Sequence, residues 1–75
     1  MAAGDDARAR IQRLLVTGDN RLKQGGPEQA RKARETYEKA LAEAEAAGLA
    51  DDLIRSLLVR RIADCRVLEG IDASD

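Results

Sequence analysis

LLVTGDNRLKQG, residues 14–25, is followed 45 positions later by a related stretch, VRRIADCRVLEG, residues 59–70. The ungapped alignment has identical residues at three positions, namely Asp19/Asp64, Arg21/Arg66 and Gly25/Gly70. Each stretch has the apolar spacing of a helix and ends at a glycine, a residue that commonly closes helices. Two similar helices with a different helix between them are typical of helical-repeat proteins. The sequence therefore predicts an all-α fold.

The chain divides into three amphipathic segments. Their boundaries are marked by glycine, proline and paired aspartates, at Gly25-Gly26-Pro27, Gly48, Asp51-Asp52 and Gly70. Such residues end one helix or begin the next. We predict helices at residues 6–24, 27–47 and 52–69, with flexible ends at residues 1–4 and 71–75. Short turns favour antiparallel neighbours, so we expect a single domain over the whole 75-residue chain, an antiparallel three-helix bundle.

The core should be thin and made by closely packed helices. Hydrophobic residues are 44% of the chain, but many are alanine and Tyr37 is the only aromatic residue. Gly18 lies in the middle of the apolar stripe of the first segment. Because glycine in a helix costs roughly 1 kcal/mol relative to alanine, its presence predicts that another helix backbone approaches closely there. Tyr37 is the expected large anchor on the inner face of the second segment.

The third segment is apolar over more than one stripe. A helix covered only by the first two would not need so wide an apolar surface, so part of it should meet another chain or element. Wrapping by the other two helices remains the alternative, since small proteins expose apolar atoms. The predicted self-association face consists of Leu53, Leu57, Val59, Val67 and Leu68. Two-fold pairing is the commonest assembly of soluble proteins, so we predict a homodimer through this segment.

Residues that carry chemistry are few. The chain has no histidine and one cysteine, Cys65, so it cannot assemble the usual transition-metal ligand sets or a nucleophile with a histidine base. We expect no catalytic residue, no metal and no cofactor. Net charge is −1 and aromatic residues for base stacking are lacking, which disfavours nucleic acid. The alternative is a weak nucleic-acid-binding accessory domain that uses basic residues of the first segment, Arg8, Arg10, Arg13, Arg21 and Lys23.

The cellular location follows from apolar runs and cysteine use. No segment approaches the roughly 20 apolar residues of a membrane span, and the N-terminal residues lack the pattern of a signal peptide. A lone cysteine cannot form an internal disulfide, which fits a reducing compartment. We predict a cytoplasmic protein without membrane contact.

The residues Gly18, Leu22 and Gly25, followed by ARETYEKAL at 33–41, resemble the tetratricopeptide repeat family. In that family a small residue in the first helix lets the second pack against it, a glycine ends the turn, and Ala, Tyr and Ala recur on the second helix. Ala33, Tyr37 and Ala40 match that trio. The resemblance covers residues 11–70, about one and a half repeats, although the period of 45 exceeds the usual 34 or so.

The resemblance implies a non-catalytic scaffold that binds a protein or peptide in a groove lined by its first helices. The corresponding positions here are Leu15, Asp19, Arg60 and Asp64. They lack the Lys and Asn pair by which some members hold a peptide carboxylate, so an apolar or basic partner surface fits better. The predicted three-helix architecture is also similar to that of the microtubule-interacting and trafficking domain, a three-helix adaptor. This domain is the alternative family.

Overall fold

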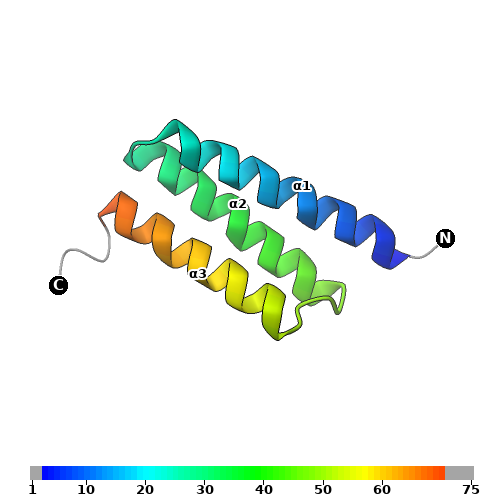
Figure 1. Cartoon of the computed structure of the whole chain (residues 1–75). Coiled ribbons are helices and arrows are strands. Elements are labelled where there is room, and N and C mark those ends of the chain that lie inside the picture. The colour runs from blue at the N-terminus through cyan, green and yellow to red at the C-terminus, as the bar shows by residue number, and fades with distance from the viewer. Residues whose placement is uncertain (1–2, 71–75) are drawn as a thin grey trace.

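The computed structural model describes residues 3–70, with side chains from residue 6 onward. Within this range the chain forms three helices, α1 (Ala3–Gln24), α2 (Pro27–Ala46) and α3 (Asp52–Glu69). Figure 1 shows that neighbouring helices run antiparallel, so that α1 and α3 point the same way. The central helix α2 packs against both others, whereas α1 and α3 approach each other less closely. The predicted all-α, antiparallel three-helix fold is confirmed.

The turns have the backbone geometry that their residues favour. Gly25 and Gly26 have positive φ angles of 80° and 91°, a region that residues with a side chain rarely adopt, and Pro27 opens α2. Asp51 caps α3, since its side chain accepts a hydrogen bond from the Ile54 amide at 2.9 Å. Gly70 then closes α3 in the left-handed conformation. These cap residues explain why α2 and α3 lie within one residue of their predicted bounds.

The start of α1 differs from the prediction. The helix begins at Ala3, so Ala3 and Gly4, which were predicted to be flexible, are helical. Asp6 therefore lies in the first turn, where a carboxylate interacts favourably with the positive end of the helix dipole. The remaining residues of the predicted flexible ends, 1–2 and 71–75, lie outside the described part of the chain.

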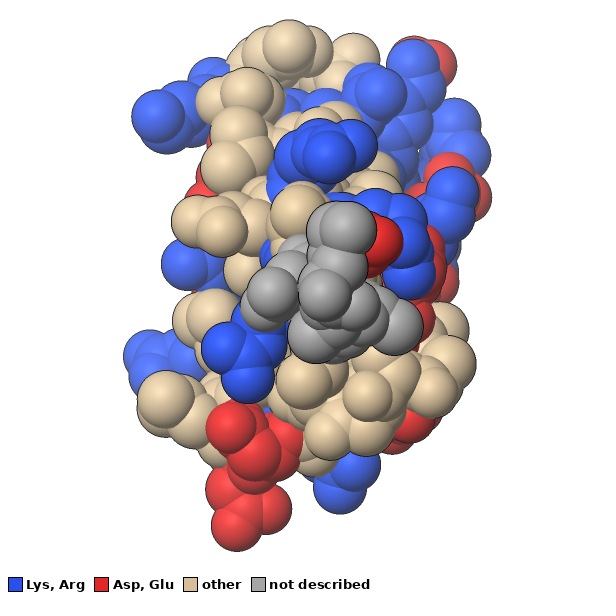
Figure 2. Space-filling model, turned by 90° about the vertical axis from the view of Figure 1, so that its right-hand side faces the viewer, with Lys and Arg blue, Asp and Glu red and all other residues tan. Residues whose placement is uncertain are grey.

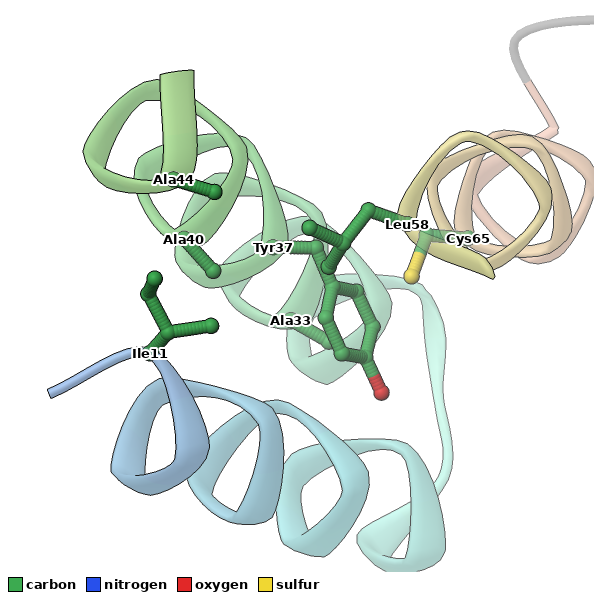
Figure 3. Packing of buried hydrophobic residues seen from close by; sticks show 7 residues of the cluster. All are labelled: Ile11, Ala33, Tyr37, Ala40, Ala44, Leu58 and Cys65. Atoms are coloured by element: carbon green, nitrogen blue, oxygen red, sulfur yellow. The ribbon is translucent and has the colours of Figure 1, made fainter. Parts of the chain in front are cut away.

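Tyr37 is the centre of the core. It is fully buried, and Figure 3 shows its ring reaching from α2 into the space between the three helices. Leu58 and Cys65 of α3 face it from the other side. The inner face of α2 is otherwise lined by small buried residues, Ala30, Ala33, Ala40 and Ala44. The core is thus thin and has one large anchor on α2, as predicted.

Gly18 packs directly against this anchor. A Cβ atom at Gly18 would lie 2.6 Å from Cε1 and 2.8 Å from Cζ of Tyr37, closer than real side chains approach. The predicted close contact is present, but the group that occupies the space is the tyrosine ring and not a helix backbone. A glycine is needed because the ring fills the volume that any side chain would take.

Candidate interaction surfaces

Tyr37, Asp19 and Arg61 form a polar cluster that joins the three helices. The Tyr37 hydroxyl donates a hydrogen bond to Oδ1 of Asp19, and Nη1 of Arg61 donates to the same oxygen. One carboxylate of α1 therefore holds a side chain from each of the other two helices. Burial, assisted by the bond to Asp19, raises the pKa of Tyr37 above its ordinary value. The phenol consequently keeps its proton, and its role as a hydrogen-bond donor, to a higher pH than an exposed tyrosine does.

A groove of about 940 Å³ lies between the first half of α1 and the turn into α3. Its apolar lining consists of Ile11, Leu15, Leu49, Ala50 and Ile54. Its charged lining consists of Arg8, Glu45, Asp51 and Arg55. Arg55 pairs with Glu45 at 3.7 Å across the α2–α3 turn, so part of this charge is balanced within the chain. Apolar surface with a polar border is typical of sites that receive a segment of another molecule.

The structure separates the four residues that were predicted to line a partner groove. Leu15 is half-buried and lines the 940 Å³ groove. Asp19 lies one turn further along α1, where Tyr37 and Arg61 occupy its carboxylate. Arg60 and Asp64 are exposed on α3 and are not among the residues that line the groove. The structure therefore unites Leu15 and Asp19 on one side of α1 and places the other two on a separate surface.

The outer surface of α3 is rich in exposed apolar side chains. All five residues of the predicted self-association face are exposed, from 38% for Leu57 to 79% for Leu53. The fully buried residues of α3, Leu58 and Cys65, lie toward α2. The only other large apolar side chain that is exposed in the described part of the chain is Val16 of α1, at 54%. The packing of α1 and α2 thus leaves these apolar side chains of α3 exposed among the residues that the structure describes.

The end of α3 is fixed by an ion pair that was not predicted. Arg34 of α2 donates two hydrogen bonds to Glu69, from Nε at 2.7 Å and from Nη2 at 3.2 Å. The hydrogen bond to Glu69 raises the pKa of Arg34, and the Glu69 side chain is only 6% exposed. The sequence carries a signal for this role, because Glu69 continues the inward stripe of Leu58, Ile62 and Cys65 at steps of four, three and four.

Cys65 has the properties of a core residue. It is fully buried, and burial raises the pKa of its thiol from 9.0 to about 11, with smaller contributions from Glu69 and Asp64. A thiol that stays protonated and is covered by neighbouring side chains is a poor nucleophile and a poor metal ligand. We therefore assign Cys65 a structural role in the core.

Part of the basic charge of α1 is balanced by an acidic residue of α2. Figure 2 shows, over one end of the molecule, Lys and Arg side chains separated by uncharged surface and accompanied by acidic groups. Arg10 pairs with Glu43 of α2 at 3.1 Å, which neutralises part of the charge. Nucleic-acid binding depends on a concentration of positive charge along one face.

The described residues contain no group of three His, Cys, Asp or Glu side chains placed to hold a metal ion. Among the helices of residues 3–70, none has the length and apolar character needed to cross a membrane. Comparison with models of protein families, with curated proteins and with solved structures finds no match to this chain. The resemblance to tetratricopeptide repeats therefore stays a prediction.

Proposed function

We propose that this chain is a non-catalytic module for protein interaction and oligomerisation, of tetratricopeptide-like type, that forms a homodimer through α3. The observation that carries the proposal is the concentration of exposed apolar side chains on this one helix, Leu53, Leu57, Val59, Val67 and Leu68. Single apolar residues on a surface need no explanation, but five large ones exposed on one helix indicate a binding site. Two copies that place α3 against α3 would cover those of the five that face the partner.

The size of the surface favours a pair of moderate affinity. If each chain buried about 600 Å² of mainly apolar surface, the gross gain at about 25 cal/mol per Å² would be roughly 15 kcal/mol per chain. Association itself costs about 4 to 15 kcal/mol, and stable complexes bury about 800 Å² per partner. For proteins, buried area does not convert into affinity at this rate, because side-chain ordering and imperfect pairing of desolvated polar groups offset most of the gross gain. We expect a dissociation constant in the micromolar range because the assumed area is smaller than that of stable complexes.

The groove between α1 and the α2–α3 turn offers a second surface, for a protein or peptide partner. Its apolar lining, which includes Ile11, Leu15 and Ile54, suits an apolar side chain, and its charged residues suit the polar groups of the same partner. The polar cluster at Asp19 supports the groove from one side, because it fixes α1 relative to α3. A rigid groove loses little conformational freedom when a partner binds.

The non-catalytic character of the proposal is supported by the properties of the reactive groups. The chain has no histidine, and its one thiol is buried with a raised pKa. A free cysteine in a small domain without disulfides also fits a reducing compartment, so we place the protein in the cytoplasm.

Sedimentation equilibrium of the intact chain at micromolar concentrations tests the proposed function. We expect a monomer–dimer equilibrium for the parent, and a monomer for Leu57→Glu with unchanged far-ultraviolet circular dichroism. Val16→Glu is the matched control, because Val16 is an exposed apolar residue on α1 instead of α3. A parent that stays monomeric at all concentrations would overturn the proposal, as would equal loss of the dimer in both variants.

A further inference from the structure

The exposed surface of α3 contains a row with heptad spacing. Leu53, Leu57, Arg60, Asp64 and Val67 follow one another at steps of four, three, four and three. Residues with this spacing lie along one side of a helix and form the seam by which two helices pair. All five are exposed. We call this row the α3 seam. Val59 lies off it, about 120° away around the helix at 100° per residue.

The α3 seam has a charged centre between two apolar ends. Arg60 and Asp64 are one turn apart, and neither makes a salt bridge to any residue between 3 and 70. Leu57 and Val67 flank them on either side. An unpaired Arg and Asp in the middle of an apolar row fit a partner that offers the opposite charges in the opposite order.

Building on the proposed function, we propose that α3 pairs antiparallel with α3 of a second copy. The two-fold axis crosses the two helices at the level of residue 62, and the Ile62 side chain itself points inward to the core. In this register Arg60 meets the partner's Asp64, and Leu57 meets the partner's Val67. The two-fold axis generates the reciprocal pairs, so both charges and the flanking Leu57 and Val67 are matched at once. A parallel pair would instead place Arg60 against Arg60 and Asp64 against Asp64, which is repulsive.

The second copy is the occupant because the α3 seam is complementary to itself. A two-fold interface requires that one surface supply both halves of every contact, and Leu57, Arg60, Asp64 and Val67 of the seam do so among themselves. The positions beside the seam on the side away from α1 are small, namely Ser56, Ala63 and Gly70. Small residues let two helices approach closely along that side. On the other side Arg61 is held by Asp19, which neutralises its charge near the axis.

Charge reversal at the centre of the seam tests the register by sedimentation equilibrium on the intact chain. Arg60→Asp and Asp64→Arg should each raise the dimer dissociation constant at least tenfold, because each puts like charges at both central contacts. The double variant Arg60→Asp/Asp64→Arg should restore it to within about threefold of the parent. An equimolar mixture of the two single variants should also dimerise. Arg13→Asp, an exposed charge reversal on α1, is the control and should change nothing.

Failure of the register differs from failure of the proposed function. If the parent dimerises and Leu57→Glu dissociates it, but the single charge variants have no effect or the double variant does not recover, then α3 pairs in another register and this inference is wrong. If the parent stays monomeric at all concentrations, both the inference and the homodimer are wrong. Circular dichroism of every variant separates these outcomes from loss of folding.

Discussion

Gly18 differs from the four turn glycines Gly25, Gly26, Gly48 and Gly70, because only at Gly18 would an added Cβ meet another residue within 4 Å. Because the Tyr37 ring would lie 2.6 Å from any Cβ there, Gly18→Ala should lower the free energy of unfolding by about 1 to 3 kcal/mol. This loss opposes the gain of about 1 kcal/mol that alanine brings to a helix. Urea denaturation measures the difference. Asn20→Ala, at an exposed position of the same helix, is the control and should not destabilise. A Gly18→Ala protein that is more stable than the parent would show that the ring moves aside.

The Cys65 thiol predicts a loss of stability at high pH. Its pKa is about 11 in the folded chain, against an ordinary value of 9.0. As pH rises between these values, the unfolded chain loses the thiol proton while the folded chain keeps it, so the free energy of unfolding falls. The raised pKa of Tyr37 adds a further fall above about pH 10. Unfolding by urea at pH 7 to 10.5 should show a decline that begins near pH 9.

Cys65→Ala separates the two titrations. This variant should be less stable than the parent at pH 7, because it removes buried volume, but its stability should change little between pH 8.5 and 10. If the decline between pH 9 and 10 were the same with and without the thiol, another group would be its cause.

The sequence predicts some residue roles and misses others for a physical reason. Gly18 and Tyr37 stand out locally, since one breaks helix propensity and the other is the only aromatic residue. The role of Arg61 depends on Asp19, a residue 42 positions away. Nothing in the periodicity of α3 distinguishes Arg61 from a solvated arginine. Its pairing follows only when α1 and α3 are placed on α2.

At the scale of elements, the Arg34–Glu69 pair holds the end of α3 on the start of α2. Both side chains are largely covered, so Glu69→Ala leaves Arg34 without its main partner in a partly buried place. We expect this variant to lose about 2 to 3 kcal/mol of stability in urea denaturation. Arg31→Ala is the matched control, because the Arg31–Glu35 pair is exposed on both sides and should contribute less than about 0.5 kcal/mol.

Amide hydrogen exchange of Glu69→Ala shows which helix loses stability when the Arg34–Glu69 pair is removed. In Glu69→Ala the amides of the last turns of α3 should exchange faster, while those of the first half of α1 keep their protection. Uniform loss of protection in all three helices would contradict a local role for the pair.

Helix bounds were predictable where a cap residue has a clear preference and not elsewhere. Gly26-Pro27, Asp51 and Gly70 each mark a boundary by their own conformational or hydrogen-bonding character. The start of α1 has no such marker, since Ala3 and Gly4 precede two aspartates that either cap a helix or lie in its first turn. In the helix that begins at Ala3, Asp6 lies in the first turn, where a carboxylate interacts favourably with the helix dipole.

At the scale of the whole molecule, α2 makes the helix contacts that hold the fold together. Most of the large exposed apolar side chains of the described residues lie on α3. The core forms where α1 and α3 each meet α2. The sequence predicted this surplus of apolar surface on the third helix, because its count of apolar residues exceeds what one inward face requires. The sequence alone does not show which apolar residues of α3 face outward. The structure does, because Leu58 and Cys65 are buried while Leu57 and Val67 are exposed.

A dimer through α3 makes thermal stability depend on concentration. Because the second copy binds the folded chain and not the unfolded one, the melting temperature should rise as protein concentration increases from about 1 to 500 μM. Leu57→Glu should abolish this dependence, since it puts a charge into the α3 seam. Val59→Glu is the sharpest control, because Val59 is a comparably exposed apolar residue of the same helix that lies off the seam. It should keep the dependence of the parent. A melting temperature that is independent of concentration in the parent would indicate a monomer. Equal effects of the two substitutions would indicate that α3 associates through its whole apolar surface and not through the seam.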